Sequence, residues 1–374
     1  MELTHLTVHS FRNLEDSEFL FGEATNVVLG ANGAGKTSLL EALVVLGNLR
    51  SFRTNSLRRA VRHGENIFRL TGTVAIRGRE HRLEEVVDVG PPVARTLRVD
   101  GGSVDVEQYL QFFPVFAITG NDRDLITGGP EGRRALLDRF TFLLRPSYLE
   151  ELRVYQRTLR QRNAALVGGS SDADVEVWET PLAAAAATVV TARQQSATAL
   201  RELFLEVFEA LSSGESPTIT VEYRSEPWNT PFEGPERVEL LYRQRYNETR
   251  TRDRQMGFTG DGPHRHDLSL KTDGRSVRYV LSSGQTKRAA AALRLAMLAQ
   301  VERERDEHFP VIVDDVDAEL DGAALKLLVR RLGNERQLFL SSTSERVAEL
   351  VGPHGHRIKL ENGTRVSQEA ASDD

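Results

Sequence analysis

Apolar and polar residues alternate along the first part of the chain with the spacing of β-strands. A loose alternation covers residues 3–11, and a short apolar run at 26–29 ends at Gly30. From 36 to 46 the apolar residues instead fall on one face of a helix, and we expect Gly47 to end that helix. Further strand patterns follow at 68–76, 81–88 and 95–99. The first part of the chain is therefore predicted to be rich in strands.

The middle of the chain has a different period. Apolar residues recur at helical spacing over 131–144, 146–166 and 177–211, and the last of these segments is rich in alanine. A Gly-Gly-Ser-Ser sequence at 168–171 predicts a flexible break between helices. We therefore expect an inserted, mainly helical domain.

Strand and helix patterns alternate again in the last part of the chain. A hairpin is expected around Asp273-Gly274, within the strand pattern that follows Asp267. The later elements are a helix at 285–305, a strand at 311–313, a helix after Asp321 and a strand at 338–340. Such alternation favours an α/β fold. We expect residues 1–115 and 251–374 to build one sheet together, and residues 116–250 to form the helical insert.

Composition narrows the class of protein. The chain has 374 residues, of which 40% are hydrophobic, enough for one large core or two modest ones. No apolar run approaches the roughly 20 residues that cross a bilayer, and the N-terminus lacks the features of a signal peptide. We therefore expect a cytoplasmic protein with no membrane partner. Because the chain has no cysteine, disulfides, thiolate catalysis and cysteine-ligated zinc are excluded.

The charge pattern also excludes some functions. A formal net charge of -6 argues against a protein that coats nucleic acid through overall positive charge, so any DNA contact must be local. Arginine supplies most of the positive charge, and Lys36 is the only lysine before Lys271. A compact ammonium is suited to a point contact with phosphate, which makes Lys36 informative.

A phosphate-binding loop accounts for this lysine. The sequence Gly-Ala-Asn-Gly-Ala-Gly-Lys-Thr at 30–37 has the spacing of a P-loop, between an apolar strand and a helix as the mechanism requires. Its glycines let backbone N–H groups surround phosphate oxygens at the positive end of the helix dipole. Lys36 is expected to reach the outer phosphates of ATP, and the Thr37 hydroxyl to bind Mg²⁺. The residues expected to contact ATP here are Gly30, Ala31, Asn32, Gly33, Ala34, Gly35, Lys36, Thr37 and Ser38.

Two acids follow the apolar strand at 309–313. We expect Asp314 to hold Mg²⁺, directly or through water, and Asp315 to orient or deprotonate the attacking water. With Lys36, Asp315 completes the predicted catalytic pair. Alternation at the strand end predicts that the two carboxylates point in different directions. The alternative is a solvated turn or a helix cap.

A third motif, Leu-Ser-Ser-Gly-Gln at 281–285, resembles the ABC signature sequence and stands between the P-loop and the paired acids. In ABC-type ATPases this motif closes on the γ-phosphate bound by the other subunit, so Ser282, Gly284 and Gln285 are expected to contact ATP across a homodimer. The alternative is an ordinary helix N-cap. Residues 318–321 are similar to the D-loop, and Ser341-Ser342-Thr343 stands where ABC transporters place a switch histidine.

Several segments resemble the RecF family of DNA replication and repair ATPases, within the ABC/SMC-head superfamily. Near the P-loop these are Phe11-Arg12-Asn13, Leu-Leu-Glu-Ala at 39–42 and Arg-Ser-Phe-Arg-Thr at 50–54. Others are Tyr155, 161–163, Leu166 and, most specifically, Gly-Phe-Thr-Gly-Asp-Gly-Pro-His-Arg-His-Asp at 257–267. The resemblance spans about residues 6–321 and adds Arg12 to the expected ATP contacts.

One segment departs from the family pattern. Where the family usually has Pro-Glu-Asp, this chain has Gly120-Asn121-Asp122. The arginines Arg133 and Arg134 still align, although both could simply belong to a solvated helix face. His264 could be a hydrogen-bonded loop residue or a catalytic one.

The resemblance implies an ABC-type P-loop ATPase head formed by both ends of the chain. SMC heads carry very long coiled coils at the position of the insert, whereas this insert is compact. The resemblance then implies a weak, DNA-stimulated, Mg²⁺-dependent ATPase that dimerises on ATP and binds duplex DNA at single-strand gaps. RecR and RecO are the implied partners, with which such proteins favour RecA loading.

Two other functions stay open. One is the nucleotide-binding subunit of a transporter, which the segment at 262–265, the missing switch histidine and the insert disfavour. The other is an ATPase-gated nuclease or defence protein, although no extra acidic cluster for metal-dependent cleavage follows Asp321.

Overall fold

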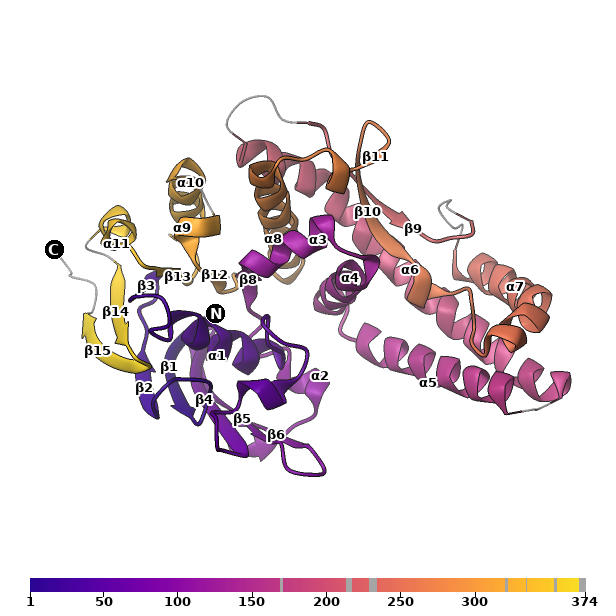
Figure 1. The fold of residues 1–374 in the computed structure, drawn as a ribbon, viewed down its shortest axis with the longest axis horizontal. Coiled ribbons are helices and arrows are strands. Elements are labelled where there is room, and N and C mark those ends of the chain that lie inside the picture. Colours follow the sequence, from indigo (N-terminus) through magenta and orange to yellow (C-terminus); the bar gives the residue numbers. More distant parts are fainter. Residues whose placement is uncertain are drawn as a thin grey trace.

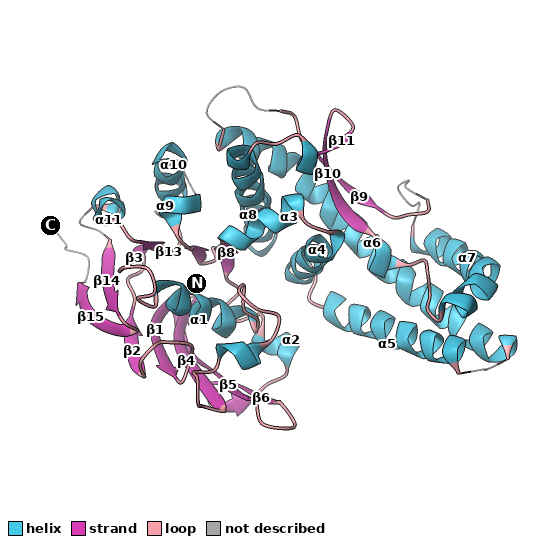
Figure 2. Cartoon of the chain, viewed as in Figure 1, coloured by secondary structure: helices cyan, strands magenta, loops and turns pink. Residues whose placement is uncertain are grey.

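The computed structural model describes residues 1–168, 171–212, 217–228, 234–319, 322–333, 335–352 and 355–369. Most of its strands gather at one end of the molecule, whereas its longest helices lie at the other end together with a small sheet (Figure 2). None of the helices in these ranges has the length and apolar character needed to cross a membrane. Of the break expected at 168–171, Gly169 and Ser170 lie outside the described residues.

The central sheet takes strands from both ends of the chain, in the order β15-β14-β3-β13-β12-β8. All neighbouring pairs are parallel except β14 and β15. Every residue of β3, β12 and β13 is buried, because helices and the second sheet cover this layer. The expected α/β fold built by both chain ends is confirmed. The strands are β3 (Thr25–Leu29), β8 (Phe116–Ile118), β12 (Val311–Val313), β13 (Leu338–Ser342), β14 (His356–Glu361) and β15 (Thr364–Glu369).

Helix α1 (Lys36–Asn48) follows β3 and corrects one prediction. Gly47 does not end the helix, which continues to Asn48 before Leu49 adopts φ 57°. A Cβ at Gly47 would lie 2.2 Å from the carbonyl oxygen of Phe113, so the glycine permits close packing. The other helices around this sheet are α8 (Ser283–Arg305), α9 (Val316–Glu319), α10 (Gly322–Leu332) and α11 (Glu345–Val351).

A second, antiparallel sheet packs against α1, in the order β2-β1-β4-β5-β6-β7. The strand patterns at 68–76, 81–88 and 95–99 all fall within it. Its elements are β1 (Glu2–His9), β2 (Ser17–Leu20), β4 (Ile67–Ile76), β5 (Arg79–Asp88), β6 (Ala94–Val99), β7 (Gly102–Ser103) and the following helix α2 (Val106–Tyr109).

The helical part of the chain extends away from the two sheets (Figure 1). Its helices are α3 (Arg123–Thr127), α4 (Pro130–Leu144), α5 (Tyr148–Val167), α6 (Asp172–Ala210) and α7 (Pro235–Met256). A small sheet, β9 (Thr220–Arg224), β10 (Asp267–Thr272) and β11 (Arg275–Ser276), packs on α6. The sequence patterns missed α7 and β9. The expected boundaries at 116 and 250 remain predictions. Strand pairing crosses both of them, because β8 pairs with β12 in the central sheet and β10 pairs with β9.

The segment at 257–267 ties these helices together. His264 shares a 2.6 Å hydrogen bond with the Tyr155 hydroxyl and a 3.0 Å hydrogen bond with the Thr259 carbonyl oxygen. Desolvation lowers the pKa of His264 to about 4, so the imidazole is neutral near pH 7. These contacts match the loop interpretation of His264 and place it within the helical part.

Arg133 and Arg134 also take part in this packing. Arg133 forms a bidentate ion pair with Asp267, with N···O distances of 2.8 and 2.9 Å. Arg134 donates to the carbonyl oxygen of His266. Neither guanidinium belongs to a merely solvated helix face, because both connect α4 to the segment at 257–267.

Glu85 is an unusual residue of the second sheet. Its side chain is fully buried on β5, and the carboxylate accepts no hydrogen bond from the described residues, although Arg95 Nε lies 3.1 Å away. Desolvation raises the pKa of Glu85 to about 8, against an opposing effect of Arg95.

We expect the stability of the protein to fall as pH rises from about 4.5 to 8, because the folded state keeps a proton on Glu85 that the unfolded chain has released. The slope should reach up to ~1.4 kcal/mol per pH unit. Urea unfolding of wild type and Glu85→Gln at several pH values would measure it. The variant should lose this contribution, whereas Glu84→Gln on the adjacent position should retain it. Equal slopes in wild type and Glu85→Gln would contradict the prediction.

Candidate functional site

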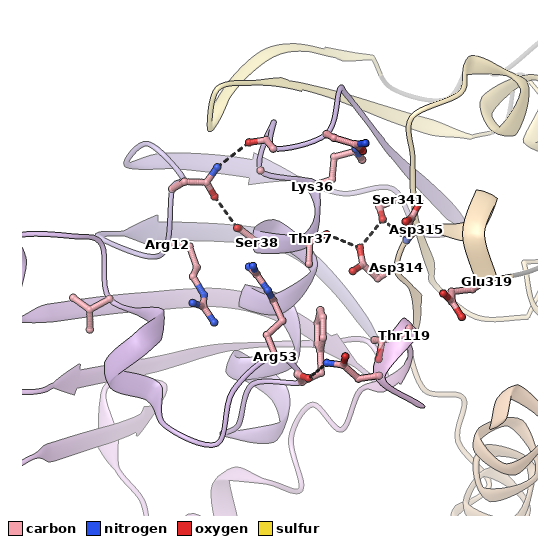
Figure 3. A pocket seen from close by; sticks show the side chains of 18 of the residues that line it. Arg12, Lys36, Thr37, Ser38, Arg53, Thr119, Asp314, Asp315, Glu319 and Ser341 are labelled. Carbon is pink, nitrogen blue, oxygen red and sulfur yellow. Dashed lines mark hydrogen bonds between the residues drawn. The ribbon is translucent and has the colours of Figure 1, made fainter. Parts of the chain in front are cut away.

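A cavity of about 820 Å³ opens where the P-loop faces the carboxyl ends of the central strands. Figure 3 shows Asp314, Asp315 and Ser341 on one side of Lys36 and Thr37, with Arg12 and Ser38 on the other. Carboxyl ends of parallel strands meet at one edge of a sheet, which explains why β3, β12 and β13 all contribute to this cavity.

The P-loop turns tightly between β3 and α1. Gly30 adopts φ 156°, and a Cβ there would lie 2.5 Å from the Leu360 carbonyl oxygen. Gly35 adopts φ 107° and precedes Lys36, the first residue of α1, without a side-chain cap. Among the described residues, no side-chain oxygen therefore caps the first N–H groups of α1. Such a helix start is suited to binding an anion.

Lys36 is nearly buried in this loop. Its ammonium donates to the carbonyl oxygens of Gly30 at 2.7 Å and Ala31 at 3.0 Å. Desolvation lowers the pKa of Lys36, while the negative charges of Asp315, Asp314 and Asp317 oppose that shift. The ammonium thus stands between the P-loop backbone and a group of carboxylates.

Thr37 and Asp314 meet although 277 positions separate them. The Thr37 hydroxyl donates to Asp314 Oδ1 at 3.1 Å, and the Ser341 hydroxyl donates to the same oxygen at 2.7 Å. Burial raises the pKa of Asp314, with the two hydroxyl contacts opposing the shift. These hard oxygen donors fit Mg²⁺, which proteins usually hold through one or two side chains together with substrate phosphates. A bound cation would favour the charged carboxylate.

Asp315 differs from its neighbour in both exposure and conformation. Asp314 is buried and Asp315 is exposed, and both line the cavity. The Asp315 backbone adopts φ 53°, and its N–H donates to Ser341 Oγ at 2.8 Å. Ser341 therefore contacts both acids. Ser342 instead donates to Asp317, so Ser341 is the best candidate for the switch position.

Arg12 lines the cavity and is held by a buried acid. Its guanidinium forms a bidentate pair with Glu41, at 2.8 and 2.6 Å, and Glu41 also accepts from Arg53 at 3.3 Å. Asn13 accepts a hydrogen bond from Ser38 and donates to the Gly33 carbonyl oxygen. The RecF-like segments at 11–13 and 50–54 therefore lie beside the P-loop.

Several lining residues were missed by the sequence patterns: Asn13, Phe52, Arg53, Val61, His63, Thr119, Gly120, Asn121 and Glu319. The segment at 120–122, which departs from the family pattern, contributes Gly120 and Asn121 to the cavity lining. Asn121 also donates a hydrogen bond to the Phe52 carbonyl oxygen at 2.7 Å. The Asp122 carboxylate accepts a hydrogen bond from the Thr119 N–H at the start of this turn, and it forms an ion pair with Arg294 on α8. Sequence patterns gave a signal for some of these residues without assigning them to the cavity, through the segments at 11–13, 50–54, 120–122 and 318–321.

The signature segment does not line this cavity. Ser282 caps α8 in a capping box with Gln285, as the alternative interpretation expected, and both Ser282 and Gly284 are exposed. A single chain therefore leaves Ser282, Gly284 and Gln285 away from its own P-loop. Of the D-loop-like residues, Glu319 lines the cavity, whereas Leu320 and Asp321 lie outside the described residues.

Comparison with known proteins agrees with this geometry. The sequence pattern of the RecF/RecN/SMC N terminal domain matches residues 2–364. A protein named DNA replication and repair protein RecF, from Anaeromyxobacter sp. (strain Fw109-5), is 35% identical over 97% of this chain and 98% of its own length. This chain belongs to the RecF family. A RecF protein of Pectobacterium atrosepticum is 32% identical, with coverage of 97% and 98%.

Solved structures extend the likeness to the fold of this RecF-family chain. A structure described as the recombination mediator protein RecF-ATP in the RecFOR pathway aligns with a TM-score of 0.89 at 25% identity, over 98% of this chain and 97% of that one. An Smc head domain from Pyrococcus furiosus aligns with a TM-score of 0.53 at 16% identity, over 98% and 96%, which shows the shared head fold.

Proposed function

We propose that this RecF-family chain is an Mg²⁺-dependent ATPase. The observation that carries the proposal is the cavity itself, in which Lys36, Thr37, Asp314 and Asp315 meet from separate parts of the sequence. The P-loop would bind the phosphates, and Thr37 and Asp314 would hold Mg²⁺, which screens phosphate charge. Asp315, exposed toward the cavity, would accept a proton from water or orient it. Arg12 would contribute a fixed positive charge.

We further propose that ATP joins two copies into a clamp on duplex DNA near single-strand gaps, with weak, DNA-stimulated hydrolysis releasing it. The exposed Ser282 and Gly284 and the half-buried Gln285 support this arrangement, because they lie outside the cavity of their own chain. Resemblance to the family suggests RecR and RecO as partners, RecA loading as the outcome, and the cytoplasm as the location. Sedimentation with and without ATP and gapped duplex DNA tests the clamp, since an ATP-indifferent monomer would exclude it.

If each ATPase site is built from the P-loop of one subunit and the signature segment of the other, two inactive variants should restore activity when they are mixed. Lys36→Ala and Ser282→Arg should each be nearly inactive as homodimers. In a mixed dimer one site carries both defects, and the other combines an intact Lys36 with an intact Ser282 from the partner subunit. Mixing the two variants should restore roughly a quarter of wild-type ATPase activity, because about half of random dimers are mixed and each has one intact site.

Tethering the two variants in one polypeptide enforces pairing and should raise the recovered activity. A tethered dimer that binds ATP and still does not turn over would mean that sites are not shared or that both must be intact. Crosslinking a cysteine placed at 282 to one placed in the partner's P-loop separates these two cases. Because the chain has no native cysteine, only the introduced thiols can form the crosslink.

A further inference from the structure

Arg139 lies close enough to two other arginines, Arg50 and Arg305, for their positive charges to act on its guanidinium. Arg50 follows α1, Arg139 lies on α4, and Arg305 is the last residue of α8. Arg139 Nη2 donates to Asn48 Oδ1 at 2.5 Å, and Arg305 Nε donates to the Leu143 carbonyl oxygen at 3.0 Å. In Figure 1, α4 lies between the central sheet and the long helices, so these contacts connect both parts of the chain.

The charges of the three arginines are not balanced by ion pairs. No carboxylate of the described residues lies within 4.0 Å of these guanidiniums. The nearby Asp138 pairs with Arg193 instead, and Glu307 has its closest cation in Arg77. The acceptors at Asn48 and Leu143 are neutral; they fix the guanidiniums in position without cancelling their charge.

The position of Arg139 is electrostatically unfavourable for the protein alone. Desolvation and the positive charges of Arg50 and Arg305 lower the pKa of Arg139 to about 9. A concentration of like charge that the fold holds in place is typical of a site that receives an anion. Arg50 gives a ligand access to this site, because the residue is exposed, whereas Arg139 and Arg305 are half-buried. Desolvation also lowers the pKa of Arg50, so its guanidinium lies partly shielded from water.

We propose that Arg50, Arg139 and Arg305 form a phosphate-binding site, and that a DNA backbone phosphate occupies it. Guanidinium groups bind phosphate through paired hydrogen bonds, and three of them match a tetrahedral group with several acceptor oxygens better than a single carboxylate. The assignment of the phosphate to DNA rests on the proposed clamp function, whereas the phosphate chemistry does not. Phe52 and Arg53, just after Arg50, line the ATP cavity, so one short segment connects the two sites.

The first test measures duplex DNA binding by fluorescence anisotropy as a function of salt concentration. Arg50→Met removes an exposed side chain that makes no hydrogen bond to the described residues, so the variant should fold normally. We expect affinity at low salt to fall roughly three- to tenfold and the slope of log K against log salt to fall by about 1. Arg303→Met, in the same last turn of α8, is the matched control and should leave the slope nearly unchanged. Arg50→Lys should recover part of the affinity.

The second test uses inorganic phosphate in the Lys36→Ala background, where the P-loop is disabled. Phosphate should raise the melting temperature of this protein, and adding Arg50→Met should abolish the shift. A reduced DNA slope supports occupancy by DNA. Loss of the phosphate shift with unchanged DNA binding would assign the site to free phosphate and overturn the DNA assignment. If Arg50→Met changes neither the salt dependence of DNA binding nor the phosphate-induced shift in melting temperature, the proposal is overturned. If wild type binds no DNA, the clamp fails while the phosphate test still decides the arginine site.

Discussion

Replacing Lys36 by alanine should abolish measurable ATP binding while the protein stays folded. Among the described residues that line the cavity, Lys36 is the only lysine, and its ammonium donates to the carbonyl oxygens of Gly30 and Ala31 in the P-loop. Loss of a charge-assisted contact to phosphate costs about 3 kcal/mol, or more than roughly 100-fold in affinity. Equilibrium binding of a fluorescent ATP analogue measures the loss, and circular dichroism verifies the fold.

Lys36→Arg is the matched variant, because it keeps the positive charge and changes its shape. It should bind ATP and hydrolyse it poorly, since a planar guanidinium does not reproduce the point contact of an ammonium. Normal turnover in a well-folded Lys36→Ala protein would show that the nucleotide lies elsewhere.

Replacing Asp315 by asparagine should slow ATP hydrolysis by roughly 100- to 10,000-fold while ATP-dependent dimerisation persists. Thr37 and Asp314 remain in place to hold Mg²⁺, so the change removes only the proton acceptor. Pre-steady-state hydrolysis measures the rate, and sedimentation with ATP measures dimerisation. The variant should also stay on DNA longer.

Asp314→Asn is the comparison variant, because it changes the proposed Mg²⁺ ligand and leaves the proposed proton acceptor Asp315 in place. It changes the carboxylate that accepts hydrogen bonds from Thr37 and Ser341, so it should raise the Mg²⁺ concentration needed for activity. Unchanged hydrolysis in Asp315→Asn would show that another residue positions the water, and the half-buried Glu319, which also lines the cavity, would be tested next. Dimerisation lost together with hydrolysis would instead assign Asp315 to nucleotide binding.

Short motifs and periodicity determined much of this protein. The spacing at 30–37 predicts a strand, a tight turn and a helix, and all three are present, because glycine conformation and helix propensity act within a few residues. The apolar strand at 311–313 followed by two acids is likewise local information. Together with the signature-like segment, these features were sufficient to predict the fold class, and they located the P-loop and the paired acids that line the cavity.

Tertiary structure decided which distant residues meet. Nothing in the sequence near Ser341 distinguishes it from Ser342; only the pairing of β12 with β13 puts its hydroxyl against Asp314 and Asp315. Gly47 behaves as a packing residue inside α1 because Phe113 approaches it there. The unbalanced arginines at 50, 139 and 305 come from three helical regions whose contact no local pattern encodes. Sequence spacing governs turns and caps through short-range sterics, whereas burial, charge and ligand geometry depend on contacts between segments that are distant in the sequence.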